Sequence, residues 1–134
     1  MSLEKALKTS MESIPECLAA GYIDMETGML LGVKTTKAHP RSVLETLAAA
    51  TADLFQGQSI AELEATLKAE RRSEDENPHY FYEIIVFSKN LLHVFMRTKK
   101  YPEHVVCYIC RKSANPGMVL AKSKMGLESV SAAV

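Results

Sequence analysis

The sequence of 134 residues predicts an α/β domain of the α+β type, in which helices cover both faces of a central five-stranded antiparallel sheet. One observation is a meander of three strands, residues 80–88, 91–97 and 104–111, separated by short turns. The other is that both sets of alternating side chains in these strands are apolar, whereas a sheet with one wet face has polar residues at every second position. We therefore expect three layers, α/β/α.

Composition and charge limit the classes of function. With 47 % hydrophobic residues, the chain 1–134 is expected to form one domain with a sizeable core. Its 16 basic and 16 acidic residues balance, so no net field attracts nucleic acid, and no apolar run approaches the roughly 20 residues needed for membrane insertion. Three cysteines, an odd number, argue against a disulfide framework and favour a cytoplasmic location.

Two helices in the N-terminal half should pack on the sheet. Ser2 can cap the first, residues 3–14, which has one apolar face and one charged face. The second begins near Pro40 and runs to about Phe55. Its apolar residues cover so much of the circumference that we expect two contacts, one with the sheet and one with a second copy of the chain.

A β-hairpin should lie between these helices, with strands at residues 17–24 and 29–34. In its turn, Gly28 is suited to a positive φ, and the Asp24 carboxylate can accept hydrogen bonds from backbone amides. We therefore expect Asp24 to shape the turn and not to act in catalysis.

An inserted helix and loop occupy about residues 57–78. Ser59 and Glu62 match a capping box, which predicts a helix to about residue 72. Residues 71–78 are polar and without periodicity, which predicts a loop.

A last helix is expected from Pro116, with Gly126 interrupting it and residues 129–134 fraying. The apolar residues expected to face inward are Met118, Ala121, Met125 and Val130.

The sequence contains no combination of residues that predicts catalysis, a metal site or a cofactor site. Cys107 and Cys110 are spaced as C-x-x-C, but within a strand their side chains point to opposite faces, so we expect core thiols. His93 lies among apolar neighbours in a strand and is expected to be structural. Phosphate-binding and nucleophile motifs are absent.

The strand at residues 80–88 would be an outer strand if the meander ends the sheet. It has no internal proline or lysine to prevent pairing, so we expect it to pair antiparallel with the same strand of a second copy. The alternative is that the inserted helix folds over this edge within one chain. The residues expected at the dimer interface are Val43, Leu47, Ala50, Leu54, Phe81, Glu83, Ile85 and Phe87.

The element order, helix, hairpin, helix, three-strand meander, helix, resembles the roadblock/LC7 (dynein light chain) superfamily. The resemblance covers most of the chain and includes Gly21-Tyr22-Ile23-Asp24 and Thr27-Gly28-Met29-Leu30-Leu31-Gly32. It implies a roadblock/profilin-like fold and a dimer formed through the middle helix and the outer strand. It also implies a protein that is not an enzyme and that acts as a scaffold or regulator of small Ras-like GTPases. The insertion at 57–78 departs from the family's pattern.

We therefore expect a homodimeric interaction module that binds a small GTPase or another protein, with no catalytic residues, cofactor or metal. The alternative is a profilin-like, longin or PAS-like sensory domain. That alternative requires a ligand cavity between sheet and helix, lined by Tyr22, Tyr82, His93 and Tyr108.

Overall fold

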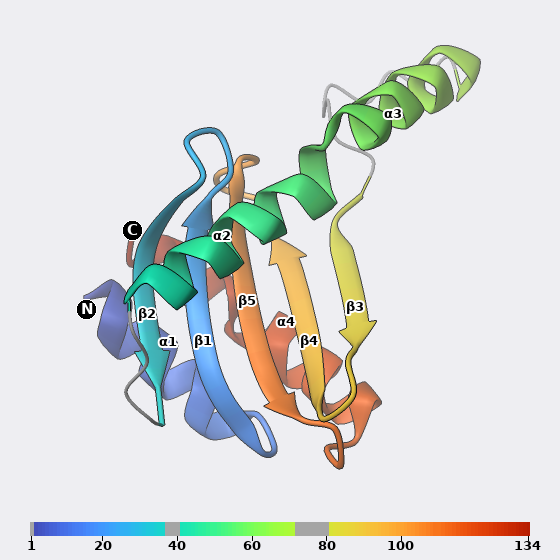
Figure 1. Ribbon diagram of the computed structural model, residues 1–134. Helices are drawn as coiled ribbons and strands as arrows, with labels where there is room; N and C mark the ends of the chain where they lie inside the picture. The colour runs from blue at the N-terminus through green and yellow to red at the C-terminus, as the bar shows by residue number, and fades with distance from the viewer. Residues whose placement is uncertain (1, 37–40, 72–80) are drawn as a thin grey trace.

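A computed structural model describes residues 2–36, 41–71 and 81–134 of the protein (Figure 1). Along the chain the elements are α1 (Leu3–Ser13), β1 (Cys17–Asp24), β2 (Met29–Thr35), α2 (Arg41–Gln56), α3 (Gln58–Arg71), β3 (Glu83–Phe87), β4 (Leu91–Arg97), β5 (His104–Arg111) and α4 (Pro116–Ala132).

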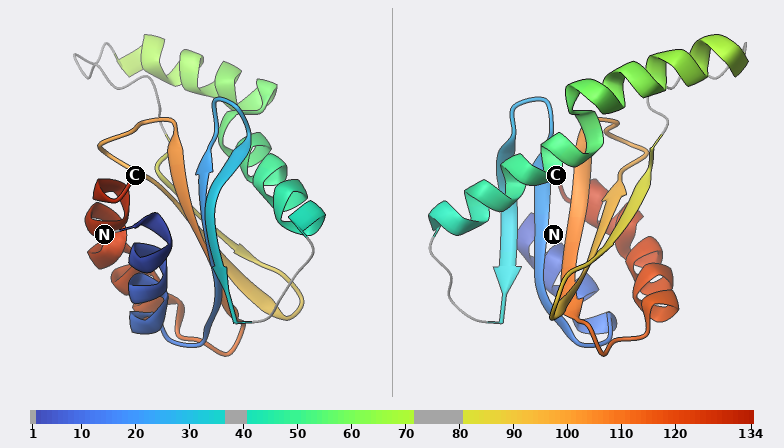
Figure 2. Two further views of the ribbon diagram at one scale, coloured as in Figure 1. Left: turned by 90° about the vertical axis from the view of Figure 1, so that its left-hand side faces the viewer. Right: turned by 45° about the vertical axis from the view of Figure 1, so that its right-hand side comes forward.

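The five strands form one antiparallel sheet in the order β2-β1-β5-β4-β3. Helices α1 and α4 lie on one face of this sheet, and α2 crosses the other face diagonally (Figures 1 and 2). The predicted three-layer arrangement is confirmed, and β3 is an outer strand. Among the described residues, no helix combines the length and apolar character that crossing a membrane requires.

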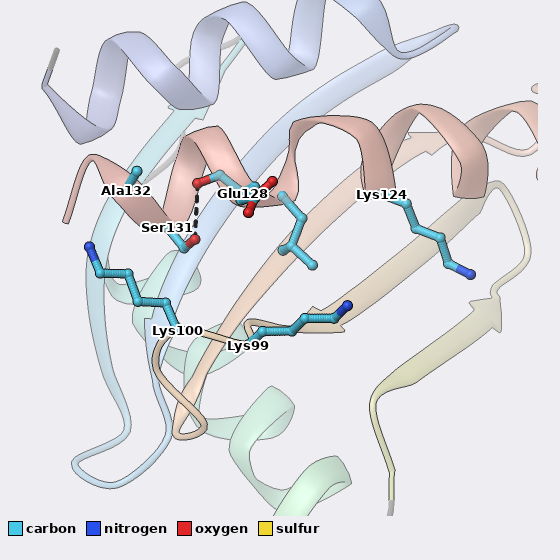
Figure 3. Close-up of a pocket in the computed structure, with 7 residues that line it drawn as sticks. Lys99, Lys100, Lys124, Glu128, Ser131 and Ala132 are labelled. Carbon is cyan, nitrogen blue, oxygen red and sulfur yellow. Dashed lines mark hydrogen bonds between the residues drawn. The ribbon is translucent and has the colours of Figure 1, made fainter.

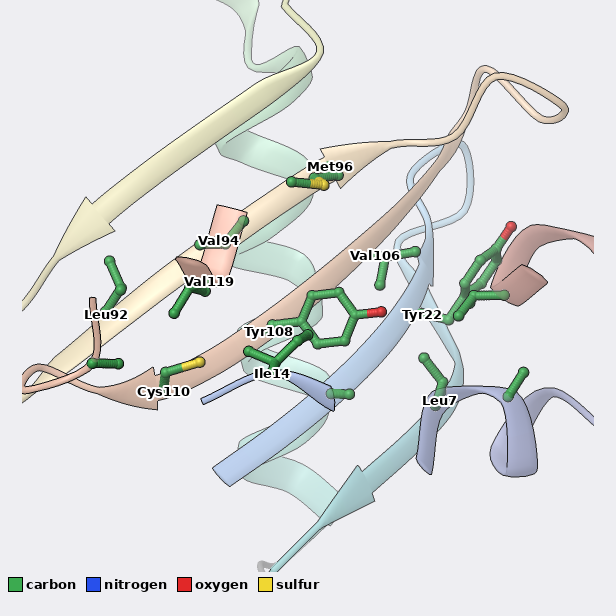
Figure 4. Packing of buried hydrophobic residues seen from close by; sticks show 14 residues of the cluster. Leu7, Ile14, Tyr22, Leu92, Val94, Met96, Val106, Tyr108, Cys110 and Val119 are labelled. Atoms are coloured by element: carbon green, nitrogen blue, oxygen red, sulfur yellow. The ribbon is translucent and has the colours of Figure 1, made fainter. Parts of the chain in front are cut away.

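Each face of the sheet has its own apolar core, as expected from strands that are apolar on both sides. Beneath α1 and α4 the core includes Leu7, Tyr22 and Tyr108, all fully buried (Figure 4). Beneath α2 a smaller core contains Phe55 and Phe95, whose rings meet edge to face with centroids 6.3 Å apart.

The N-terminal predictions are confirmed closely. The Ser2 side chain accepts a hydrogen bond from the Lys5 amide at 3.2 Å, so it caps α1. In the β1–β2 turn, Gly28 has a φ of 74° and an Asp24 carboxylate oxygen accepts from the Glu26 amide at 3.0 Å.

The outer strand is shorter than predicted. Of the strand expected at 80–88, Tyr80 lies outside the described residues and Glu83–Phe87 is observed as strand. The Tyr82 carbonyl still accepts a hydrogen bond from the Arg97 amide at 2.8 Å. Pairing therefore continues one residue beyond the strand at its start.

The capping box at Ser59 is a wrong prediction. The carbonyl of Gly57 accepts the first hydrogen bond of α3, from the Ala61 amide at 2.9 Å, so Ser59 lies inside the first turn. Glu62 accepts from the Gln58 side chain at 3.4 Å. Most of the loop expected at 71–78 lies outside the described residues, and Arg71 is the last residue of α3.

The orientation predicted for α4 is also wrong. Met118 and Met125 are exposed, Met125 by 72 %, and Ala121 is exposed as well, whereas Val130 is buried as expected. The helix continues through Gly126 to Ala132 and does not fray at 129. The buried stripe instead consists of Val119, Ser123, Val130 and Ser131.

Gly126 explains this orientation because it lies against α1. A Cβ atom added at Gly126 would lie 2.4 Å from Ser10 Oγ and 3.1 Å from Ser10 Cβ. Ser10 is itself buried, with its Oγ 2.7 Å from the Tyr108 hydroxyl. The glycine therefore allows α1 and α4 to approach closely over the sheet.

We predict that Gly126→Ala destabilises the protein. Steric overlap with Ser10 costs about 1–3 kcal/mol, which exceeds the gain of ~1 kcal/mol in helix propensity. A urea or thermal melt should show a lower midpoint. Met125→Ala, one residue earlier on the exposed face, is the control and should change stability by less than ~0.5 kcal/mol. Equal midpoints for the two variants would contradict the close approach.

Candidate functional site

The free edge of β3 is the first component of the candidate site. In an antiparallel pair, alternate residues direct both backbone groups toward the partner strand. The Tyr82 carbonyl and the Ser88 amide both bond to β4, at 2.8 and 2.9 Å, so the even-numbered residues face β4. The amides and carbonyls of Glu83, Ile85 and Phe87 therefore point away from the sheet.

The side chains of these three residues lie on the α4 face, because they pair with Met96, Val94 and Leu92 of the larger core. Ile85 is 39 % exposed and Phe87 is 54 % exposed. Glu83 bonds to Lys124 of α4 at 3.1 Å in an exposed ion pair. The edge thus combines apolar side chains with backbone groups that have no strand partner within the described part of the chain.

The opposite edge, β2, is less suited to pairing. Its register with β1 shifts between Tyr22 and Ile23, which leaves Leu31 as an extra, bulged residue. The strand also contains Lys34, and bulges and lysines are features that discourage pairing at sheet edges. Of the two edges, β3 is the one without such features.

Helix α2 supplies the second component of the site. Phe55 faces the sheet and is fully buried, whereas Ala50 and Leu54 are exposed on the outer side, Leu54 by 42 %. Ala50 and Leu54 are four residues apart and so adjoin on the helix surface. Val43 and Leu47 lie in the first half of α2, and their side chains are outside the part that the structure describes.

Helix α3 does not lie along β3. In Figure 1 it continues beyond the end of α2 and projects away from the sheet. The alternative in which this helix covers the outer edge is therefore not what the structure shows.

Arg97 connects the two components of the site, and the sequence analysis did not single it out. It ends β4 and is only 2 % exposed. Its Nε donates to the Phe81 carbonyl at 3.0 Å, and its Nη1 donates to the carbonyl of Pro102. Its guanidinium carbon lies 5.3 Å from the centroid of the Phe55 ring of α2.

Two nearby carboxylates offset part of the cost of burying Arg97. Burial lowers the pKa of Arg97 from its ordinary value, while Glu64 of α3 and Glu103 oppose this shift. Glu64 is also buried. The guanidinium Nη2 is buried and has no hydrogen-bond partner within the described residues. Arg97 thus contacts the start of β3 through Phe81 and the end of α2 through Phe55, and its charge interacts with Glu64 of α3.

A groove of about 590 Å³ lies beside the site, between the β4–β5 turn and the C-terminal half of α4 (Figure 3). Lys99 and Lys100 come from the turn, and Lys124 and Glu128 from the helix. Three lysines against one glutamate give the groove an excess of positive charge. Lys124 also bonds to Glu83, so the groove adjoins the β3 edge.

The four residues proposed for a sensory cavity do not line a common space. Tyr22 and Tyr108 are buried in the core under α1 and α4. The Tyr22 hydroxyl lies 2.8 Å from His104 Nδ1, and the Tyr108 hydroxyl lies 2.7 Å from Ser10 Oγ. Tyr82 is exposed near the outer edge. His93 is on the α2 face, stacked on Phe95 with centroids 6.2 Å apart.

The expectation for the C-x-x-C cysteines is confirmed. Cys107 lies in the core under α2 and Cys110 in the core under α1 and α4, so the two thiols are on opposite faces. Burial raises the pKa of Cys107 to about 12, which keeps it protonated. Within residues 2–36, 41–71 and 81–134, no group of three or more potential metal ligands comes together.

Comparisons with known proteins place this geometry in a recognised fold. By sequence, no protein-family model and no curated protein matches the chain. By structure, it resembles an MglB with a tetrameric arrangement, with a TM-score of 0.73 and 16 % identity over 98 % of this chain and 86 % of the other. It also resembles the gliding protein MglB from Thermus thermophilus, with a TM-score of 0.71 and 17 % identity over 98 % and 87 % of the two chains.

A third similar structure is a roadblock/LC7 domain from Streptomyces avermitilis. It has a TM-score of 0.68 and 12 % identity, and the match covers 98 % of this chain and 97 % of that domain. The fold is therefore roadblock/LC7-like, as the element order had indicated.

We predict that Arg97→Met lowers the free energy of unfolding by about 2–4 kcal/mol. It removes the hydrogen bonds to the carbonyls of Phe81 and Pro102 and the positive charge that interacts with Glu64 and Glu103. Chemical denaturation measures the change. Arg111→Met, at the exposed end of β5, is the control and should shift stability by no more than ~0.5 kcal/mol. If both variants behave alike, Arg97 does not organise this region.

Proposed function

We propose that the protein is a non-enzymatic homodimeric interaction module of the roadblock type. The observation that carries this proposal is the outer edge of β3, where Glu83, Ile85 and Phe87 direct their backbone amides and carbonyls away from the sheet. Backbone groups that lack a strand partner among the described residues, on a largely apolar strand, favour pairing with another strand. A second copy of β3 supplies a strand of the same length.

A two-fold axis through Ile85 gives a consistent register. Ile85 then pairs with Ile85 of the second copy, and Glu83 pairs with Phe87, so every residue with outward backbone groups faces another such residue. This register also keeps the two Glu83 carboxylates apart, which avoids placing like charges directly opposite each other.

The outer side of α2 would contribute to the same dimer. Ala50 is small and Leu54 is apolar, and both are exposed on the side turned away from the sheet. The paired β3 strands would bring the two α2 helices together, with Val43 and Leu47 continuing the contact along the helix. Phe81 would join the interface at the start of β3.

We infer that the dimer presents its surface to a protein partner, and that a small Ras-like GTPase is the first candidate. This part rests on the roadblock-type fold and on the MglB structures among the similar proteins. The three free cysteines fit a cytoplasmic setting. We propose neither a nucleic-acid partner nor insertion into a membrane.

We predict that Ile85→Lys converts the dimer into a monomer at tens of micromolar. Two lysines would face each other on the two-fold axis, and the apolar burial of Ile85 would be lost. We expect at least a tenfold weaker association, equivalent to about 1.4 kcal/mol. Light scattering coupled to size-exclusion chromatography measures the mass directly.

The matched control is Leu31→Lys on the opposite edge strand. Leu31 is 41 % exposed, close to the 39 % of Ile85, and it also lies on an outer strand. This variant should remain a dimer. A monomeric wild-type protein would contradict the dimer itself, and an unchanged mass for Ile85→Lys would place the interface elsewhere.

The partner proposal requires a separate measurement. Wild-type protein immobilised at one end should retain a small GTPase from a lysate of the source cells, identified by mass spectrometry, and Ile85→Lys should retain less of it. Recovery of unrelated proteins alone would contradict the GTPase assignment without affecting the dimer.

A further inference from the structure

Two of the three cysteines face each other across neighbouring strands. Cys17, the first residue of β1, is paired directly with Cys110 near the end of β5. Both side chains lie on the face covered by α1 and α4, where Cys110 belongs to the core and Cys17 packs against it. The register therefore brings two thiols together that are 93 residues apart in the sequence.

The two thiols interact and are not equivalent. A hydrogen bond from the Cys110 thiol lowers the pKa of Cys17, with burial acting in the opposite direction. The same hydrogen bond, and then burial, raises the pKa of Cys110. Cys17 is thus the better nucleophile of the pair, and Cys110 is the proton donor beside it.

Cys17 is also the more solvent-accessible of the two thiols. Cys17 is half-buried, whereas Cys110 is fully buried. The adjoining residue Glu16 has a φ of 53°, its carbonyl accepts from the Arg111 amide at 3.1 Å, and its carboxylate accepts from Ser113 at 2.9 Å. These bonds connect the end of β5 to the start of β1. Because Cys17 is the more exposed thiol, a reagent from solvent meets Cys17 first.

We propose that Cys17 and Cys110 are a thiol oxidation site that forms a reversible intrachain disulfide with a hydroperoxide as oxidant. The Cys17 thiolate attacks one peroxide oxygen, the O–O bond breaks, and Cys17 becomes a sulfenic acid while hydroxide leaves and takes up a proton. The Cys110 sulfur then attacks the Cys17 sulfur, the S–O bond breaks, and the Cys110 proton leaves with the hydroxide as water. In total, two thiols lose two electrons and hydrogen peroxide is reduced to two molecules of water.

The disulfide would connect β1 to β5 in the middle of the sheet. It would lie on strands separated from the β3 edge by β4, so it does not depend on the proposed dimer. Because the bond closes a long loop of the chain, the oxidised protein should be more resistant to unfolding than the reduced protein.

The test uses the full chain treated with hydrogen peroxide and then denatured for thiol titration and peptide mapping. Wild type should fall from three free thiols to one, should yield a peptide pair joining Cys17 to Cys110, and should recover all three thiols with a dithiol reductant. Its thermal midpoint should rise by several degrees when oxidised and return when reduced.

Substitutions separate this pair from other oxidation products. Cys107→Ser should still form the disulfide, because Cys107 is buried on the opposite face. Cys17→Ser should lose the disulfide, the midpoint shift and the fast reaction with peroxide. Mapping the wild-type protein does not depend on how well any variant folds.

Three results would overturn the proposal. Wild-type protein could accumulate sulfinic acid at Cys17 without a linked peptide, it could form only a disulfide between two chains, or it could keep three free thiols after oxidant treatment. Sulfinic acid is detected as added mass after reduction, a disulfide between two chains by gels run without reductant, and unreacted thiols by the thiol titration. None of them changes the light-scattering mass that tests the proposed dimer.

Discussion

A backbone amide or carbonyl in a sheet needs a hydrogen-bond partner, and along β3 that partner can come from β4 only at alternate residues. Glu83, Ile85 and Phe87 direct their backbone groups the other way. Water can satisfy these groups, but the apolar side chains beside them favour a partner that also removes Ile85 and Phe87 from solvent. This constraint turns a five-stranded fold into a candidate half of a larger assembly.

Arg97 connects that edge to helix α2. A single buried guanidinium bonds to the backbone on either side of it, at Phe81 and Pro102, and packs over Phe55 of α2. A buried charge is costly unless several groups surround it, so the position of each of these groups depends on the others. The start of β3 and the end of α2 are thereby fixed relative to each other before any second chain arrives.

The three layers, the sheet and the outer strand could be predicted because they depend on the spacing of apolar residues, every second residue in strands and about every 3.6 residues in helices. Strands β4 and β5 were predicted with their observed bounds, since both of their faces are apolar. The same alternation underlies the choice of Phe81, Glu83, Ile85 and Phe87 as proposed interface residues, and the structure places the side chains of Glu83, Ile85 and Phe87 on one face of β3.

The errors arise where packing requires small residues or a charge. In α4, apolar Met118 and Met125 are exposed, whereas Ser123 is buried and Gly126 lies against Ser10 of α1, because close approach of two helices favours small residues over large apolar ones. Arg97 was missed because nothing in its local pattern distinguishes a buried arginine from one in solvent. Ser59 matched a cap by type, but the carbonyl of Gly57 begins the helix two residues earlier.

The two edge strands of the sheet, β2 and β3, differ because β2 has a bulge at Leu31. This difference affects how many copies of the chain could join edge to edge. A sheet with two receptive rims could add subunits without limit and form a fibre. If two copies pair through β3, the outer edges of the joined sheet are the two β2 strands, whose bulges and lysines discourage further pairing. Association would then stop at the dimer. The extra residue Leu31, in the strand opposite the proposed β3–β3 interface, would thus prevent the dimer from extending into a polymer.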